Sequence, residues 1–145
     1  MDWLIIPLAA VTGSAFLIGR AIAQGVPDEV APNRRRLSIA QDALLIAAAV
    51  IGASALLPRW AAGAIVALLI VTRVALPERW SPTAIGAFSI GIAASDAAIL
   101  AGVAIIAIVA NLLAGALAKS WRGAMVAAAA QPVGAVLVAL LISLR

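Results

Sequence analysis

The chain has 145 residues, of which 66% are apolar and 11% are charged. Soluble domains contain about 45–50% apolar and about 25% charged residues, so this sequence has more apolar side chains than a soluble core could bury. Cysteine and histidine are both absent, which excludes disulfides, zinc fingers, iron–sulfur clusters and His-ligated haem. We therefore expect an integral membrane protein with no cofactor and no metal.

The net charge of +4 comes from ten Lys and Arg against six Asp and Glu. The densest basic run, Arg34–Arg36, is too short to form a nucleic-acid-binding surface. In membrane proteins, basic residues collect on the cytoplasmic side and set the orientation, and they also contact anionic lipid headgroups. We predict these roles for the basic residues and no nucleic-acid partner.

Three apolar segments are predicted in the first half of the chain, where a membrane span requires ~20 residues. The first covers Trp3–Ala23 and is followed by a polar loop, Gln24–Leu37. The second covers Ile39–Leu57 and the third covers Trp60–Leu76, and each of these two is followed at once by a proline. Proline cannot continue a helix, so both segments are expected to end there.

The second half contains a long apolar stretch, Ser81–Ala118, whose only charged residue is Asp96. One helix of this length would extend ~55 Å, far more than a bilayer needs. Two helices, Pro82–Ala94 and Ala97–Ala118, are the alternative, in which case the first is short and must tilt or be buried among its neighbours. The last predicted span is Gly123–Leu144.

The distribution of basic residues favours six spans over five. With six spans and the N-terminus outside, eight of the ten Lys and Arg lie on the cytoplasmic side, whereas five spans leave seven there. We therefore expect an all-α polytopic membrane protein. Residues 1–145 would form one compact bundle of six, alternatively five, transmembrane helices. The Ala- and Arg-rich composition is compatible with a prokaryotic plasma (inner) membrane.

Short sequence similarities suggest an internal repeat with halves 1–77 and 78–145. They relate residues 15–21 to 87–93, 41–47 to 95–101 and 63–67 to 123–127, in the same order along both halves. Three spans per half would make the second half inverted, as in many transporters. Chance is the alternative explanation, because alanine is abundant and the three offsets, 72, 54 and 60 residues, differ.

Asp42 and Asp96 are the carboxylates at or inside the predicted spans. An ionisable group within a membrane is costly and favours a role in binding an ion or proton. Helix capping is the competing interpretation. Ser38 and Gln41 have the spacing of a capping box that would place Asp42 just past the first turn, and either Ser95 or Asp96 would cap a helix that begins at Ala97.

Two amide side chains, Asn111 and Gln131, are predicted near the middle of the membrane. Asn111 would either hydrogen-bond to a neighbouring helix or line a polar path. Gln131 precedes Pro132, which frees the backbone carbonyl four residues earlier for a side chain or a solute. With Asp42 and Asp96, these amides are the predicted ion- or solute-binding residues.

Three functions fit these features, in decreasing order of preference. The first is a small transporter or channel for an ion or small polar solute. The second is a non-catalytic structural or accessory subunit of a larger membrane complex. An intramembrane lipid-modifying enzyme comes third, because the chain has no His and no clustered carboxylates for acid–base catalysis. We predict no enzymatic activity. The expected partners are the lipid bilayer and further copies of the chain or other membrane subunits.

Overall fold

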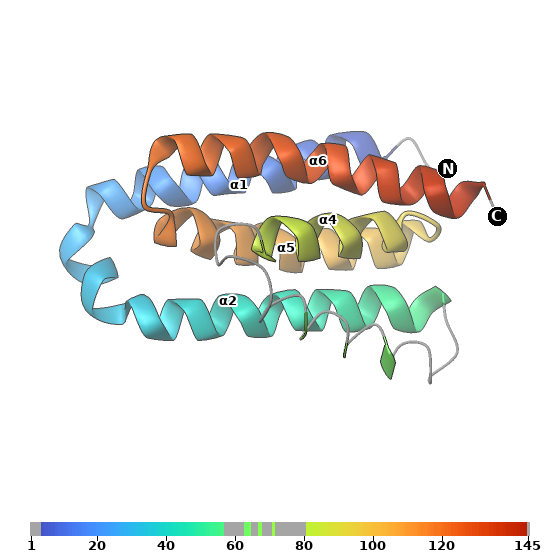
Figure 1. Ribbon diagram of the computed structural model, residues 1–145, viewed down its shortest axis with the longest axis horizontal. Coiled ribbons are helices and arrows are strands. Elements are labelled where there is room, and N and C mark those ends of the chain that lie inside the picture. The colour runs from blue at the N-terminus through green and yellow to red at the C-terminus, as the bar shows by residue number, and fades with distance from the viewer. Residues whose placement is uncertain (1–3, 57–62, 65–66, 68–70, 72–80, 145) are drawn as a thin grey trace.

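The structure, a computed structural model, describes residues 4–56, 63–64, 67, 71 and 81–144. The third predicted span, Trp60–Leu76, falls largely outside these residues. The elements assigned within the described ranges are all helices, which confirms the all-α class (Figure 1). Their bounds are α1 (Ile5–Gly25), α2 (Pro27–Leu56), α4 (Ser81–Ala93), α5 (Ala97–Leu117) and α6 (Trp121–Ser143).

Four of these helices, α1, α2, α5 and α6, are long and apolar enough to cross a membrane. Large apolar side chains cover their outer surfaces; on α6, Met125, Val133 and Leu141 are each at least 60% exposed. Most of the buried apolar residues are alanines. Such a small-residue interior with an apolar exterior suits helices packed in lipid, where close backbone approach replaces the hydrophobic effect. The chain is therefore a helical membrane bundle.

The helices form a closed ring in cross-section. α1 packs against α5 and α6, α5 also packs against α2, and α4 fills the place between α2 and α6 while touching α5. α1 and α5 run in one direction and α2, α4 and α6 in the other (Figure 1). Helix α4 is nearly enclosed, since its residues from Thr83 to Ala93 are buried apart from Ala84 and Phe88.

The predicted division of Ser81–Ala118 into two helices is confirmed. α4 ends at Ala93 and α5 begins at Ala97, within one residue of the predicted ends. The carboxylate of Asp96 accepts hydrogen bonds from the backbone N–H groups of Ala98 (2.9 Å) and Ile99 (3.2 Å). This is an N-cap, which stabilises the start of α5.

The predicted polar loop, Gln24–Leu37, is wrong. Only Val26 separates α1 from α2, and the remaining residues of the predicted loop are helical. Pro27 occupies the first position of α2, where a missing N–H costs nothing. Asp28 and Glu29 follow in its first turn, where negative charge is favourable. These residue types start a helix as readily as they fill a loop.

This change also alters the setting of two residues in the second predicted span. Ser38 lies inside α2, so the predicted capping box is wrong. Asp42 lies near the middle of α2 rather than just past its first turn, and its side chain is half-buried. At 30 residues, α2 is ~45 Å long, so its first turns extend beyond the ~30 Å hydrocarbon core.

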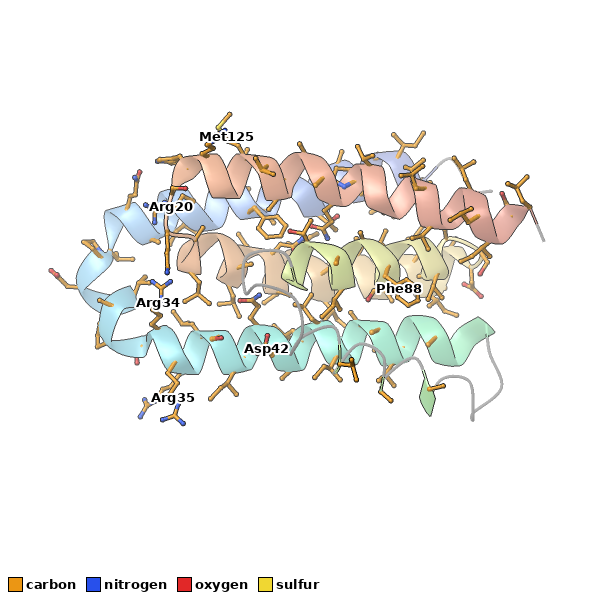
Figure 2. All side chains as sticks on the ribbon, in the orientation of Figure 1. Arg20, Arg34, Arg35, Asp42, Phe88 and Met125 are labelled. Carbon is orange, nitrogen blue, oxygen red and sulfur yellow. The ribbon has the colours of Figure 1, made fainter. Side chains whose placement is uncertain are left out.

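Every Lys and Arg among the described residues lies at one end of the bundle. Arg20 is near the end of α1, Arg34–Arg36 are near the start of α2, and Lys119 and Arg122 flank the turn from α5 to α6 (Figure 2). The turn from α4 to α5, which carries Asp96, lies at the opposite end (Figure 1). The bundle therefore has a strongly basic end.

Candidate functional site: a buried amide cluster

Two amide side chains meet in the interior of the bundle. Nδ2 of Asn111, on α5, donates a hydrogen bond to Oε1 of Gln131, on α6, at 2.7 Å. The same nitrogen donates to the backbone carbonyl of Thr12, on α1, at 2.8 Å. All three residues are 0% exposed. Asn111 therefore makes the predicted hydrogen bond to a neighbouring helix. Its two hydrogen bonds together join α5 to α1 and α6.

Close contact between α1 and α5 brings Asn111 to Thr12. Gly19 lies against the backbone of Leu112, and Gly115 lies against the backbone of Phe16. Any side chain at either glycine would collide with the facing backbone, with the facing carbonyl carbon only 2.8 Å from the added atom. Glycine is required at both positions because the two backbones touch directly.

The Thr12 carbonyl fixes the orientation of both amides. A carbonyl only accepts hydrogen bonds, so Asn111 must point its nitrogen toward Thr12. Both Nδ2 hydrogens are then used, one on Thr12 and one on Gln131, and Gln131 must present its oxygen. This leaves Oδ1 of Asn111 and Nε2 of Gln131, which have no hydrogen-bond partner in the described part of the chain.

The two unpaired atoms converge on Gly86 of α4. A methyl group added to Gly86 would lie 2.5 Å from Nε2 of Gln131 and 3.8 Å from Oδ1 of Asn111. One turn earlier on the same helix, Thr83 is 5% exposed, and its hydroxyl has no hydrogen-bond partner among the described residues. An unpaired buried polar group costs about 1–3 kcal/mol. These groups are therefore the candidate site in the part of the chain that the structure describes.

Pro132 frees the backbone carbonyl of Ala128, for which the sequence predicts a side chain or a solute as partner. In the structure this carbonyl faces the backbone of α1. The carbonyl oxygen of Ala128, four residues earlier, lies against Gly13 of α1, 2.5 Å from where a methyl group on Gly13 would stand. The freed carbonyl therefore lies at the contact between α6 and α1.

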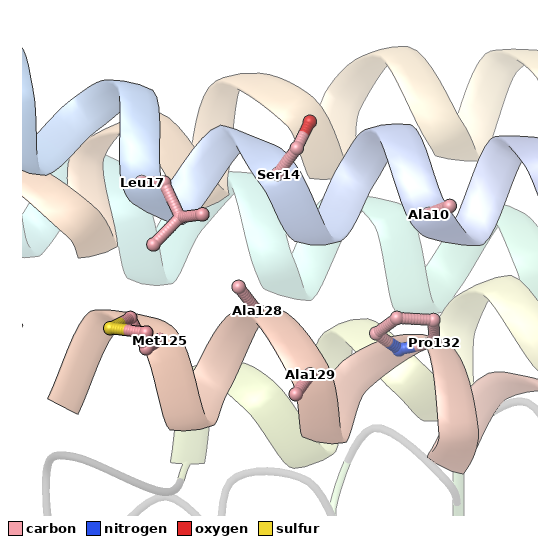
Figure 3. Close-up of a pocket in the computed structure, with 7 residues that line it drawn as sticks. All are labelled: Ala10, Ser14, Leu17, Met125, Ala128, Ala129 and Pro132. Carbon is pink, nitrogen blue, oxygen red and sulfur yellow. The ribbon is translucent and has the colours of Figure 1, made fainter. Parts of the chain in front are cut away.

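A groove of about 340 Å³ runs beside this contact, between α1 and α6 (Figure 3). Its one hydroxyl, that of Ser14, donates to the carbonyl of Val11 in its own helix at 2.7 Å and points away from α6. The lining is otherwise apolar: Ala10, Leu17, Met125, Ala128, Ala129 and Pro132. The groove therefore provides apolar surface and no polar binding site.

The two predicted carboxylates lie elsewhere. Asp96 is exposed at the N-cap of α5, and Asp42 is half-buried on α2. Neither supplies a hydrogen bond to the unpaired atoms of Asn111 and Gln131. In the described ranges, no three Asp or Glu side chains come together in a group that could hold a metal ion.

Two arginines at the basic end close the C-terminus of α5. Nη1 of Arg20 donates to the carbonyl of Ala118 at 2.8 Å, and Nη2 of Arg34 donates to the carbonyl of Leu117 at 2.7 Å. These carbonyls end a helix and lack partners within it, and the helix dipole favours a positive charge beside them. Arg20 and Arg34 thus tie α1 and α2 to the same end of α5.

Of the four residues predicted from the sequence, the structure brings together Asn111 and Gln131. Thr12, Thr83 and Gly86, which surround these amides or lie one turn away, are not among the binding residues predicted from the sequence. A hydroxyl residue within an apolar span is a usable signal for the two threonines, whereas nothing local distinguishes Gly86 from the other glycines. No protein-family model, curated protein or solved structure matches the chain.

Proposed function

We propose that the protein is a small membrane transporter or channel for an ion or small polar solute, with Asn111 and Gln131 at its binding site. The observation that carries this proposal is the pair of unpaired amide atoms buried in an apolar bundle and facing Gly86. Polar groups inside a membrane are costly, and unpaired ones more so, which favours a functional reason for keeping them.

We further propose a six-span topology, with the basic end in the cytoplasm and the start of α1 outside. The clustering of Lys and Arg supports this orientation. The direction of the helices supports the span number, because α2 and α4 run the same way (Figure 1), as a topology with one further span between them requires.

An inverted repeat is part of the same proposal. Related helices run in opposite directions, α1 against α4 and α2 against α5. Their contacts correspond in part: Gly115 of α5 faces the Phe16 carbonyl of α1, and Gly52 of α2 faces the Ser89 carbonyl of α4. Transport would then proceed by movement of α4 relative to α6, which opens the amide cluster alternately to the two sides.

Flux measurements in proteoliposomes test the proposal. Asn111→Leu keeps the approximate size of the side chain and removes both of its hydrogen bonds, so we expect protein-dependent solute flux to fall to the level of empty liposomes. Ser89→Ala is the matched control, because Ser89 is also fully buried but its hydroxyl donates to Ile85 of its own helix. The absence of flux in the unaltered protein would contradict the proposal, as would equal flux in both variants.

An accessory subunit of a membrane complex, or a self-associating scaffold, is the second candidate. The observation that favours it is an outward-facing small-residue surface on α5, where Ala98 is exposed and Gly102 has no neighbour within 4 Å in the described part of the chain. Such a surface permits close approach of another helix. Cross-linking of Ala98→Cys in native membranes tests it: a single cross-linked product and no flux from the purified protein would favour this function.

A further inference from the structure

The polarity of the unpaired groups narrows the class of solute. The site offers one acceptor, Oδ1 of Asn111, and one donor, Nε2 of Gln131. The hydroxyl of Thr83, one turn from Gly86, can act as either. A molecule that satisfies all of these groups must itself both donate and accept hydrogen bonds.

Ions do not match this set. A hard cation needs several oxygen ligands, as the six to eight around Ca²⁺ illustrate, whereas the cluster has one free amide oxygen, with the Thr83 hydroxyl on the preceding turn of α4. An anion needs several donors or a nearby positive charge. The described Lys and Arg lie at the basic end, where Arg20 and Arg34 donate to the end of α5.

We infer that the solute bound by the amide cluster is a small uncharged molecule that both donates and accepts hydrogen bonds. This inference rests on the proposed transport function and specifies its substrate class. Nε2 of Gln131 packs directly against Gly86, where even an added methyl group would stand 2.5 Å from it. The site therefore favours molecules between water and urea in size over larger polyols.

Stopped-flow light scattering on proteoliposomes tests the inference with defined probes. Water, urea and glycerol are the uncharged probes, and K⁺ and Cl⁻ fluxes are followed in parallel with ion-sensitive dyes. We expect permeability to water or urea to exceed that of empty liposomes, with glycerol, K⁺ and Cl⁻ unchanged. Asn111→Leu should abolish the increase, and Ser89→Ala should retain it.

Thr83→Val separates a binding role from a structural one. The substitution keeps the shape of the side chain and removes a hydroxyl that has no described partner, so the folded protein should be at least as stable as before. If the hydroxyl binds solute, permeability to the transported probe should nevertheless fall, by up to about tenfold for one lost hydrogen bond. Unchanged permeability would remove Thr83 from the site.

The outcomes distinguish the inference from the function on which it depends. Asn111-dependent flux of K⁺ or Cl⁻ without flux of water or urea would overturn the inference and leave the transport function standing. Absence of flux for all five probes would overturn both. Water or urea flux that persists in Asn111→Leu would show that the solute passes elsewhere and would overturn the inference.

Discussion

The interface between α1 and α5 and the interface between α4 and α6 both depend on glycine, but they use it differently. Gly19 and Gly115 bring the α1 and α5 backbones into direct contact. Gly86 instead makes room for the flexible end of a side chain, the Gln131 amide. A backbone contact can be relieved only by moving a helix, whereas the end of a flexible side chain can shift. Gly91 of α4 also meets backbone, since a methyl group there would stand 2.8 Å from the carbonyl oxygen of Ala135 on α6. The adaptable part of the α4–α6 interface is therefore the Gln131 side chain beside Gly86.

We expect the largest effect when glycine is replaced by alanine in the α1–α5 interface, and we compare it with the same substitution in the α4–α6 interface. Gly115→Ala forces the α1 and α5 backbones apart and should lower the free energy of unfolding by about 2 kcal/mol or more. In Gly86→Ala, a small shift of the flexible Gln131 side chain that keeps its hydrogen bond from Asn111 limits the strain, and the helix gains about 1 kcal/mol from alanine, so stability should change little. Thermal unfolding in detergent, followed by circular dichroism, checks the comparison. Equal losses would show that the two interfaces are alike.

The second prediction concerns the polar link between the two interfaces. Asn111→Leu leaves the Thr12 carbonyl and Oε1 of Gln131 without their donor, so we expect a loss of about 1–2 kcal/mol in the free energy of unfolding. Ser89→Ala removes a bond within α4 alone and should cost less. A loss in Asn111→Leu no greater than in Ser89→Ala would mean that the amide pair does not join the helices.

The third prediction concerns the basic end of the bundle, where Arg20 of α1 contacts the C-terminus of α5. Arg20→Met removes the charge-assisted hydrogen bond to Ala118 and should cost about 1–2 kcal/mol in the free energy of unfolding. Arg35→Met is the control, because Arg35 is exposed at the same end. The same unfolding measurement applies, and equal stability of the two variants would contradict the role of Arg20.

The smallest effect is expected at Asp96, which the sequence allowed as either an ion site or a cap. Asp96→Ala removes the cap of α5 and should cost about 1 kcal/mol. Asp96→Asn keeps an acceptor oxygen, so both stability and solute flux should stay close to those of the unaltered protein. Loss of flux in Asp96→Asn with unchanged stability would instead favour a carboxylate site.

The membrane class, the α1, α5 and α6 spans and the break before Ala97 could be predicted from the sequence, because apolar run length and Asp96 carry that information directly. The start of α2 could not, since Pro27, Asp28 and Glu29 suit a loop or a helix start equally. The amides were identifiable as polar residues inside apolar spans. Their convergence on Gly86 depends on how α4 packs against α6, which no local pattern encodes.

Solute flux through the Gly86→Ala protein is the most direct test of the central claim. The substitution removes no hydrogen-bonding group and places a methyl group 2.5 Å from Nε2 of Gln131 and 3.8 Å from Oδ1 of Asn111. We predict a folded, monodisperse protein with a nearly unchanged melting temperature, whose flux falls to that of empty liposomes. Undiminished flux in a folded Gly86→Ala protein would contradict the claim that the solute passes through the amide cluster.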